Sequence, residues 1–329
     1  MTTLHLTFAC ESYDRIRALQ DGRVRPEGID LNILALPVEE TFYRQARYRE
    51  FDISEMSLSS YLVTLDADEP PFVALPVFPS RSFRHQSIYV NTGSGIAAPA
   101  DLVGKRVGVP EYQLTAVVWQ RGILAEHHGV PVESVRYFTG GMEQPGRTEK
   151  LKLNLPPGVS VTPIPAGQTL SAMLAAGELD AVYCAGQPAG YGTLPQLGRL
   201  FEDFPEVEAD YYRRTGIFPI MHTVVLRREL HQRHPWIARS LTKAFQASLD
   251  IAYADLAQRN ALKVMLPWLD RHLADTVGVL GSRYWDYGVD ANRHVLETFS
   301  RYHHEQGLSA KARTAEEIVL AQAADSFVL

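Results

Sequence analysis

The sequence is short of cysteine, of long apolar runs and of positive charge, and each shortage excludes a class of protein. Its 329 residues include two cysteines, Cys10 and Cys184, whose wide separation gives neither a metal-binding spacing nor a disulfide framework. No apolar run approaches the ~20 residues that a membrane-spanning helix needs, so we expect no membrane association. The net charge of −6 gives no electrostatic support for binding nucleic acid.

Signals for export and for cofactors are also missing. The first residues carry no basic region and no apolar stretch of roughly 7–15 residues, as a secretory signal would, so we expect a cytoplasmic protein. No phosphate-binding loop or dinucleotide fingerprint is visible, and no pair of histidines has the spacing of a zinc-binding helix. The sequence therefore predicts no cofactor and no metal.

The composition that remains is typical of a soluble α/β protein of two domains. Hydrophobic residues make up 46% and charged residues 21% of the chain, and the length suggests two domains at roughly 150 residues each. Short apolar runs alternate with helical patterns, as in α/β folds. Strands are expected over residues 4–9, 29–36, 51–56, 72–78, 87–91, 105–110, 159–164, 179–184 and 218–226, and the longest helices over 112–128, 236–257 and 292–304.

The domains are expected to be discontinuous. A Gly/Ser stretch at 91–95 interrupts the first α/β series, and a strand pattern returns at Phe218. We therefore predict one lobe from residues 1–92 and 219–329, and an inserted lobe from 93–218, with a ligand cleft between them.

The same pattern predicts where a ligand would bind. In open α/β sheets, ligands bind beyond the carboxyl ends of strands, close to helix N-termini. This places Ser12 (the expected N-cap of the first helix), residues 57–59, residues 80–85 and residues 111–115 along the cleft. Ser57 and Ser59 either contact the ligand or simply begin a helix, where serine is common.

Arg81, Arg84 and His85 give the sharpest local signal for an anionic ligand, because arginine binds carboxylates in a bidentate manner. In an extended strand, Arg81 and His85 share one face and Arg84 lies on the other. One arginine is therefore expected to face the ligand together with His85. The alternative is a solvated edge that holds one salt bridge.

Glu111 and His222 are further candidates, each with an ordinary structural alternative. Glu111 stands between a predicted strand and the helix after it, where it can cap the helix or accept a proton. His222 lies within an apolar strand, either as a hydrogen-bonded core residue or facing the cleft.

Six segments resemble the 4,5-dihydroxyphthalate decarboxylase family, and together they span nearly the whole chain. They are VFPSRSFRH (77–85), SIYVN (87–91), GVPEYQLTA (108–116), LSAMLAAGELD (170–180), YYRRTGIFPIMH (211–222) and RYHHEQGLS (301–309). The resemblance implies a two-lobed type 2 periplasmic-binding-protein-like fold with a helical C-terminal segment. It also implies an enzyme that removes one carboxylate from a dihydroxylated aromatic diacid without an organic cofactor.

On this basis His85 is predicted to donate the ring proton, Glu111 or His222 to act as the phenol base, and Arg81 to anchor a carboxylate. The roles of the two histidines can be exchanged. The residues expected to bind the substrate are Ser12, Ser57, Ser59, Arg84, Tyr112, Gln113 and Thr115. The alternatives are a cytoplasmic small-carboxylate binding protein of the same fold, or an enzyme that acts on another cyclic acid. A small aromatic carboxylate is the expected partner, with a homo-oligomer as a further possibility.

Overall fold

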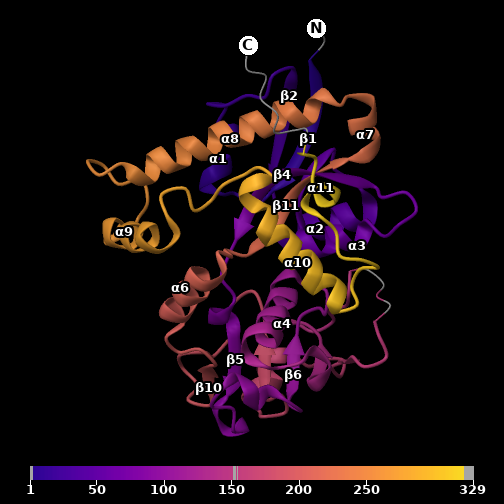
Figure 1. The fold of residues 1–329 in the computed structure, drawn as a ribbon, viewed down its shortest axis with the longest axis vertical. Helices are drawn as coiled ribbons and strands as arrows, with labels where there is room; N and C mark the ends of the chain where they lie inside the picture. The colour runs from indigo at the N-terminus through magenta and orange to yellow at the C-terminus, as the bar shows by residue number, and fades with distance from the viewer. Residues whose placement is uncertain (1–2, 151–152, 154, 322–329) are drawn as a thin grey trace. The chain divides into compact units, whose positions relative to one another are not determined.

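The computed structural model describes residues 3–150, 153 and 155–321. The chain forms two compact units, and neither is continuous in sequence (Figure 1). Unit 1 comprises Met1–Arg81, Ile220–Glu297 and Arg313–Leu329. Unit 2 comprises Ser82–Pro219 and Thr298–Ala312. The two units are described separately below.

Unit 1 is built on a mixed five-stranded sheet. The strand order is β2 (Ile29–Ala35), β1 (Leu4–Cys10), β3 (Ile53–Ser57), β11 (Ile220–Arg227) and β4 (Phe72–Arg81). β1 is parallel to β2 and β3, whereas β11 is antiparallel to β3 and β4. The carboxyl ends of β1, β3 and β4 and the amino end of β11 therefore meet at one edge of the sheet.

Helices pack on β3 and on the edge strand β4 of this sheet, which explains the apolar sequences of these two strands. Every residue of β3 is buried, and so is nearly every residue of β4, as expected for strands with both faces covered. The long helix α8 (Trp236–Ala257) packs beside α1 (Asp14–Gln20), and the hydroxyl of Ser248 donates to the carbonyl of Arg15 at 2.8 Å. The other helices of this unit are α2 (Val38–Tyr48), α3 (Leu58–Thr64), α7 (Arg228–Arg233), α9 (Leu269–Leu280) and α11 (Ala315–Ile318).

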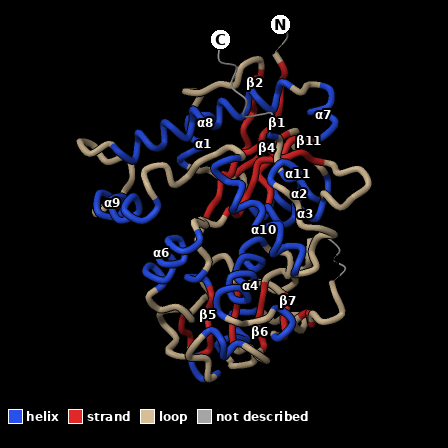
Figure 2. The backbone as a smooth tube through the Cα atoms, viewed as in Figure 1, coloured by secondary structure: helices blue, strands red, loops and turns tan. Residues whose placement is uncertain are grey.

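Unit 2 contains a six-stranded sheet. Its order is β10 (Leu197–Arg199), β5 (Ile88–Asn91), β9 (Ala181–Tyr183), β6 (Arg106–Val109), β7 (Arg136–Thr139) and β8 (Ser160–Pro163), drawn in red with the other strands in Figure 2. The last four strands are parallel, and β5 is antiparallel to both its neighbours. The helices α4 (Thr115–His128), α5 (Leu170–Ala175) and α6 (Phe204–Thr215) belong to this unit.

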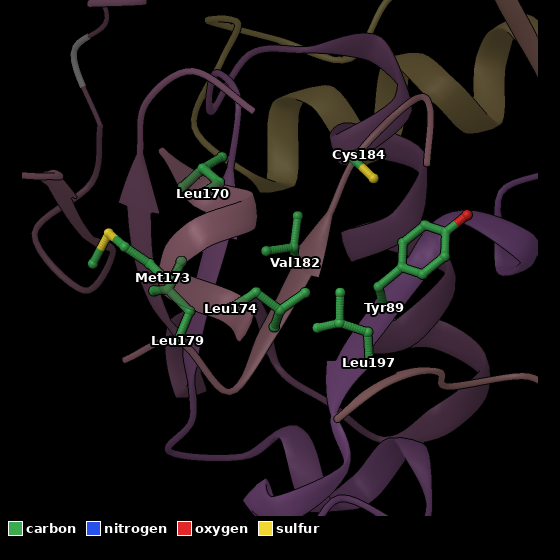
Figure 3. Packing of buried hydrophobic residues seen from close by; sticks show 8 residues of the cluster. All are labelled: Tyr89, Leu170, Met173, Leu174, Leu179, Val182, Cys184 and Leu197. Carbon is green, nitrogen blue, oxygen red and sulfur yellow. The ribbon is translucent and has the colours of Figure 1, made fainter. Parts of the chain in front are cut away.

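An apolar cluster fills the space between α5 and the sheet of unit 2. Leu170 and Leu174 of α5 meet Val182 of β9 and Tyr89 of β5, as Figure 3 shows. Its members, each at most 7% exposed, are Tyr89, Leu170, Met173, Leu174, Leu179, Val182, Cys184 and Leu197. Burial of this apolar surface is the main favourable contribution to the stability of this part of the fold.

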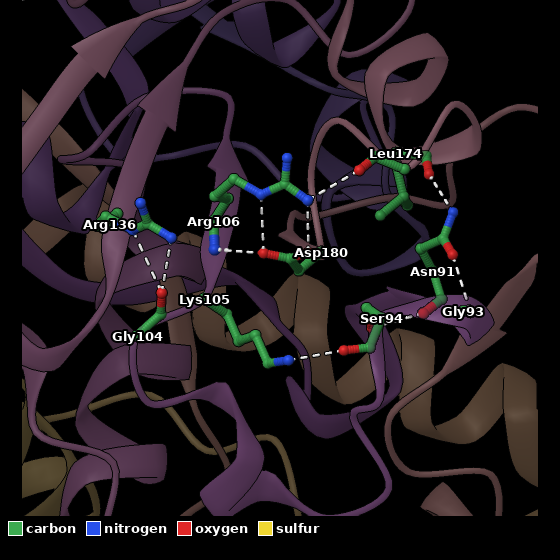
Figure 4. A network of polar contacts seen from close by, with 10 residues as sticks. Asn91, Gly93, Ser94, Gly104, Lys105, Arg106, Arg136, Leu174 and Asp180 are labelled. Atoms are coloured by element: carbon green, nitrogen blue, oxygen red, sulfur yellow. Dashed lines mark hydrogen bonds and ion pairs between the residues drawn. The ribbon is translucent and has the colours of Figure 1, made fainter.

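A polar network ties the strands of unit 2 at the end opposite to the predicted ligand edge (Figure 4). The Arg106 side chain donates to Asp180 at 2.7 and 3.0 Å and to the carbonyl of Gly177 at 2.8 Å. The amide of Asn91 donates to the carbonyl of Leu174 at 2.8 Å. These bonds satisfy backbone groups at the end of α5 that would otherwise lack partners.

The predicted boundary at residue 92 is wrong, because residues 82–92 belong to unit 2. β5 (Ile88–Asn91) pairs with β9 and β10, so this segment forms an inner strand of the second sheet. The Gly/Ser stretch that follows is a short 3-10 turn, which the side chain of Asn91 caps by accepting from the amide of Gly93. Such a turn resembles a linker in sequence, although it only ends a strand.

The assignment of the whole C-terminal region to one lobe is also wrong, because residues 298–312 belong to unit 2. These residues include the second half of α10 (Arg293–Glu305), where the Phe299 ring packs on Trp119 of α4 with centroids 5.1 Å apart. The Gln306 side chain accepts from Nε of Arg121 at 2.7 Å and donates to the carbonyl of Val118 at 2.9 Å. Both contacts close the core of unit 2 around α4.

Local details near the candidate site also differ from expectation. Ser12 is not an N-cap, since α1 begins after Tyr13 without a side-chain cap. β4 ends at Arg81 and His85 begins a 3-10 turn, so the predicted alternation of Arg81, Arg84 and His85 across an extended strand does not occur. Within the described residues, no helix is both long and apolar enough to cross a membrane.

The packing of α10 on α4 predicts a strong effect at Gly122. A Cβ added there would overlap the ring of Tyr302, which is fully buried. We expect Gly122→Ala to destabilise the protein by about 1–3 kcal/mol through overpacking, seen as a lower Tm. Gly186→Ala is the matched control, because nothing lies within 4 Å of the added Cβ. An unchanged Tm for Gly122→Ala would contradict this packing.

Candidate active site

The candidate site lies at the edge of the unit 1 sheet where the carboxyl ends of β1, β3 and β4 meet the start of β11. In register, His222 of β11 lies opposite Ser57 of β3 on one side and Ser80 of β4 on the other. Glu55 lies two residues before Ser57, and Tyr13 follows β1 at the start of α1. The sheet topology thus brings together residues that are distant in sequence.

Glu55 is the centre of a hydrogen-bonded group. Its Oε1 accepts from the hydroxyl of Tyr13 at 2.7 Å and lies 2.6 Å from Nδ1 of His222. Its Oε2 accepts from the backbone amide of Glu11 at 3.1 Å. Because an ionised carboxylate only accepts hydrogen bonds, these contacts assign the proton of the imidazole to Nδ1.

The surroundings keep Glu55 ionised although its side chain is 0% exposed. Burial alone would raise the pKa of Glu55. The attraction to His222 when its ring is protonated, together with the hydrogen bonds from His222, Tyr13 and the backbone amide of Glu11, outweighs burial and lowers this pKa below its ordinary value. Burial and the charge of Glu55 raise the pKa of the Cys10 thiol well above its usual value, so this cysteine is a buried thiol and not a reactive thiolate.

His222 presents its second nitrogen away from Glu55. The side chain is 17% exposed, and one side of the ring packs at a right angle on Phe42, with centroids 4.8 Å apart. Among the described residues, no hydrogen-bond partner contacts Nε2 of His222. With Nδ1 held by a carboxylate, Nε2 is free to accept a proton from a bound molecule and to return it.

Arg81 and Ser57 lie at the same edge but are engaged in structural contacts. Nη2 of Arg81 donates to the carbonyl of Asp286 at 2.9 Å and to Oδ1 of Asn292. The hydroxyl of Ser57 accepts from the amide of Ser60 and caps α3. Ser59 is buried in α3, and Ser12 is exposed, with its hydroxyl near the Gln20 side chain.

His85 lies in unit 2, within a packed aromatic cluster. It is 2% exposed, and its ring contacts those of Phe201, Tyr211 and His128 with centroids 5.2, 5.1 and 6.3 Å away. Its Nδ1 lies 4.0 Å from Glu208, too far for a hydrogen bond. Burial, with smaller effects from the nearby histidines and Arg214, lowers the pKa of His85 to about 3, so the imidazole is neutral near pH 7.

Arg84 and Glu111 are also buried in unit 2, and each has protein partners. Nη1 of Arg84 donates to the carbonyl of Ala185 at 3.1 Å, and burial lowers the pKa of Arg84 to about 10. Glu111 forms ion pairs with Arg147, at 2.6 Å, and with Lys150. It is therefore neither a helix cap nor an unpaired base.

Tyr112, Gln113 and Thr115 are buried around the start of α4. The hydroxyl of Tyr112 donates to the carbonyl of Gln306 at 3.2 Å. In the described part of the chain, neither side-chain polar atom of Gln113 has a hydrogen-bond partner. Nearby, burial first and then the charge of Glu111 raise the pKa of Glu149 to about 7.

The structure thus groups His222, Arg81 and Ser57 in unit 1, and places His85, Arg84, Glu111, Tyr112, Gln113 and Thr115 in unit 2. Sequence reasoning missed Glu55 and Tyr13. Glu55 did carry a signal, since it is the one charged residue in the strand sequence ISEMS, whose other residues suit a buried strand. Among the described residues, no cluster of three or more histidine, cysteine or acidic side chains has the arrangement of a metal site.

The burial of His85 gives a test of its predicted role as proton donor. A donor would lose about 10²–10⁴-fold in kcat when replaced by Gln. The packed, neutral environment instead predicts that His85→Gln lowers Tm while kcat changes little.

The pH dependence of unfolding gives a second measurement on the same variant. Between pH ~6.5 and ~3 the unfolded chain binds a proton at His85 that the folded chain does not bind. His85 therefore lowers the free energy of unfolding as the pH falls through this range. His85→Gln should lose less stability than the parent on acidification, and an identical pH profile would contradict the neutral burial.

Comparison with known proteins gives matches over the whole chain. A 4,5-dihydroxyphthalate decarboxylase of Comamonas testosteroni is 43% identical over 328 residues, which cover 99% of both chains. A protein of the same name from Pseudomonas putida is 47% identical over 214 residues, 65% of this chain and 83% of that one. No family model matches the sequence.

Solved structures establish the fold. The periplasmic aliphatic sulphonate-binding protein SsuA of Escherichia coli superimposes with a TM-score of 0.54 at 12% identity, covering 97% of each chain. The SsuA protein of Methylobacillus flagellatus gives 0.52 at 14% identity, covering 98% of this chain and 93% of that one. The two-sheet architecture is therefore that of the periplasmic-binding-protein-like fold, as the sequence predicted.

Proposed function

The chain belongs to the 4,5-dihydroxyphthalate decarboxylase family, and from this premise we propose that it removes one carboxylate from 4,5-dihydroxyphthalate as CO₂. The product of that reaction is 3,4-dihydroxybenzoate, which keeps the second carboxylate. The 43% identity over essentially the full length of both chains supports this substrate class.

The chemistry requires a base at a ring hydroxyl. Breaking the bond between the ring and the carboxylate directly would leave an electron pair on an aryl carbon, which is very unstable. A hydroxyl para to that carbon avoids this. When it loses its proton, the ring carbon can be protonated to give a dienone. Loss of CO₂ then returns the bonding electron pair to the ring and restores aromaticity.

We assign the base to His222, and the observation that carries this assignment is its contact with the buried carboxylate of Glu55 at 2.6 Å. Glu55 holds the proton on Nδ1 and leaves the lone pair of Nε2 available. It also stabilises the imidazolium that forms when Nε2 takes the phenolic proton, because the two charges attract in a site of low dielectric. Nε2 returns the proton to the same oxygen as the ring becomes aromatic again.

The proton that forms the new ring C–H bond is a second proton, and one is consumed for each CO₂ released. Glu111 as an alternative base and Arg81 as a carboxylate anchor stay predictions, and the kcat of His85→Gln decides whether His85 is the donor of this second proton. Glu111 is paired with two cations, and the pKa of His85 is low. For both reasons His222 is the better candidate for accepting a proton near pH 7.

The phenolic oxygen itself accepts the electron pair during this reaction, so the chemistry needs neither an organic cofactor nor a metal. Purified protein incubated with 4,5-dihydroxyphthalate should release CO₂ and form 3,4-dihydroxybenzoate. In D₂O the product should carry one deuterium on the carbon that lost the carboxylate. Activity should persist after dialysis against a chelator. If dialysis abolished the activity and a divalent metal restored it, the proposal that the reaction needs no metal would be contradicted.

The same incubation distinguishes the other candidate functions. Tight binding of the diacid without release of CO₂ would indicate a binding protein. Release of CO₂ only from other cyclic acids would change the substrate and leave the reaction type in place.

Substitutions at Glu55 and His222 test the proposed base. We expect His222→Asn to lower kcat by about 10²–10⁴-fold, the usual contribution of a general base, with a much smaller change in KM. Glu55→Gln should also lower kcat, because an amide can donate to Nδ1 and fix the wrong tautomer. His272→Asn is the control, since this histidine is exposed on α9. Full activity of His222→Asn would refute the assignment.

A further inference from the structure

Arg15 is connected to the Glu55–His222 pair through Tyr13. The guanidinium carbon is 4.1 Å from the centre of the Tyr13 ring, and the hydroxyl of that ring donates to Glu55. Nε of Arg15 donates at 2.5 Å to the carbonyl of Pro79, the residue before Ser80, which lies opposite His222 in the sheet. Arg15 therefore belongs to the same edge of the sheet, all within unit 1.

The guanidinium group is held rigidly. The indole of Trp285 also contacts it, at 4.3 Å from the ring centre, and this indole is itself fixed by a hydrogen bond of 2.9 Å to the carbonyl of Phe78. The rings of Tyr13 and Trp285 thus both pack on the guanidinium of Arg15, whose side chain is only 14% exposed. A cation in this setting loses little conformational freedom when it binds an anion.

Most of the hydrogen-bonding capacity of Arg15 remains unused. A guanidinium has five N–H donors. Nε donates to the carbonyl of Pro79, and Nη1 donates to Oδ1 of Asp14 at 3.0 Å. Within the described residues the side chain makes no other hydrogen bond. Asp14 is 42% exposed, so its pairing with Arg15 is screened by solvent and contributes little.

We propose that Arg15 binds the carboxylate that the substrate retains, and this inference rests on the proposed decarboxylase function. A cation on the departing carboxylate would stabilise the ground state and slow the loss of CO₂, whereas a cation on the retained carboxylate orients the ring without this cost. The planar guanidinium fits a carboxylate in the bidentate geometry. Arg81 is less suited, because Nη2 already donates to Asp286 and Asn292.

The test compares two small molecules that differ only in this carboxylate. 3,4-Dihydroxybenzoate keeps it, and catechol lacks it. Inhibition constants against 4,5-dihydroxyphthalate are measured for the parent and for Arg15→Gln, with Arg17→Gln as the control on the exposed face of α1. We expect Arg15→Gln to raise the inhibition constant of 3,4-dihydroxybenzoate by about 10- to 100-fold, as for the loss of a charged hydrogen-bonding pair. The inhibition constant of catechol should not change.

The inference would be overturned if Arg15→Gln raised the inhibition constants of both compounds by the same factor, or changed neither of them. If Arg15→Gln does not fold, Arg15→Lys takes its place, because it keeps the charge but loses the bidentate geometry. This variant should weaken the binding of 3,4-dihydroxybenzoate and leave the binding of catechol unchanged. Failure of the proposed function is recognised separately: the parent protein then releases no CO₂, and direct calorimetric binding of 3,4-dihydroxybenzoate and catechol still compares the variants.

Discussion

The buried carboxylate of Glu55 is the constraint on which the candidate site depends. A charge without solvent is tolerated only when hydrogen bonds and an opposite charge compensate for the lost hydration. Here the compensation comes from β11 through His222, from the start of α1 through Tyr13 and from the turn after β1 through Glu11. The edge where these elements meet is therefore fixed by electrostatics as well as by the apolar core. A base that is already oriented in this way needs little reorganisation during a reaction.

Much of the fold could be predicted because its elements carry strong local patterns. The helix expected over 236–257 is α8, and the strand expected over 29–36 is β2 within one residue. The domain boundaries could not be predicted in the same way. Residues 87–91 read as a strand in either unit, and only pairing with β9 and β10 assigns them to the second sheet. Membership in a unit is a matter of long-range contact, and a Gly/Ser turn gives no information about it.

The candidate site was harder to predict than the fold for a related reason. Arg81 and His85 are close in sequence, but the chain passes from unit 1 to unit 2 between them, so their proximity in sequence suggested a shared face that does not exist. Glu55 and His222 are 167 residues apart, and no spacing rule connects them. A carboxylate in a buried strand is nevertheless informative without a structure, since it requires a partner somewhere in the fold.

The interleaving of the two units has a consequence for the order of folding during synthesis. Unit 2 lacks the Phe299 ring that covers Trp119 until residues 298–312 have left the ribosome, although most of it is made by Pro219. Unit 1 is completed later still, because the carbonyl of Ile318 accepts from the hydroxyl of Tyr61 and Val319 bridges to Ala74. Closing such long loops is entropically costly and slow. A nascent chain therefore exposes two incomplete apolar cores at once, and its dependence on chaperones should exceed that of a protein whose domains follow one another in sequence.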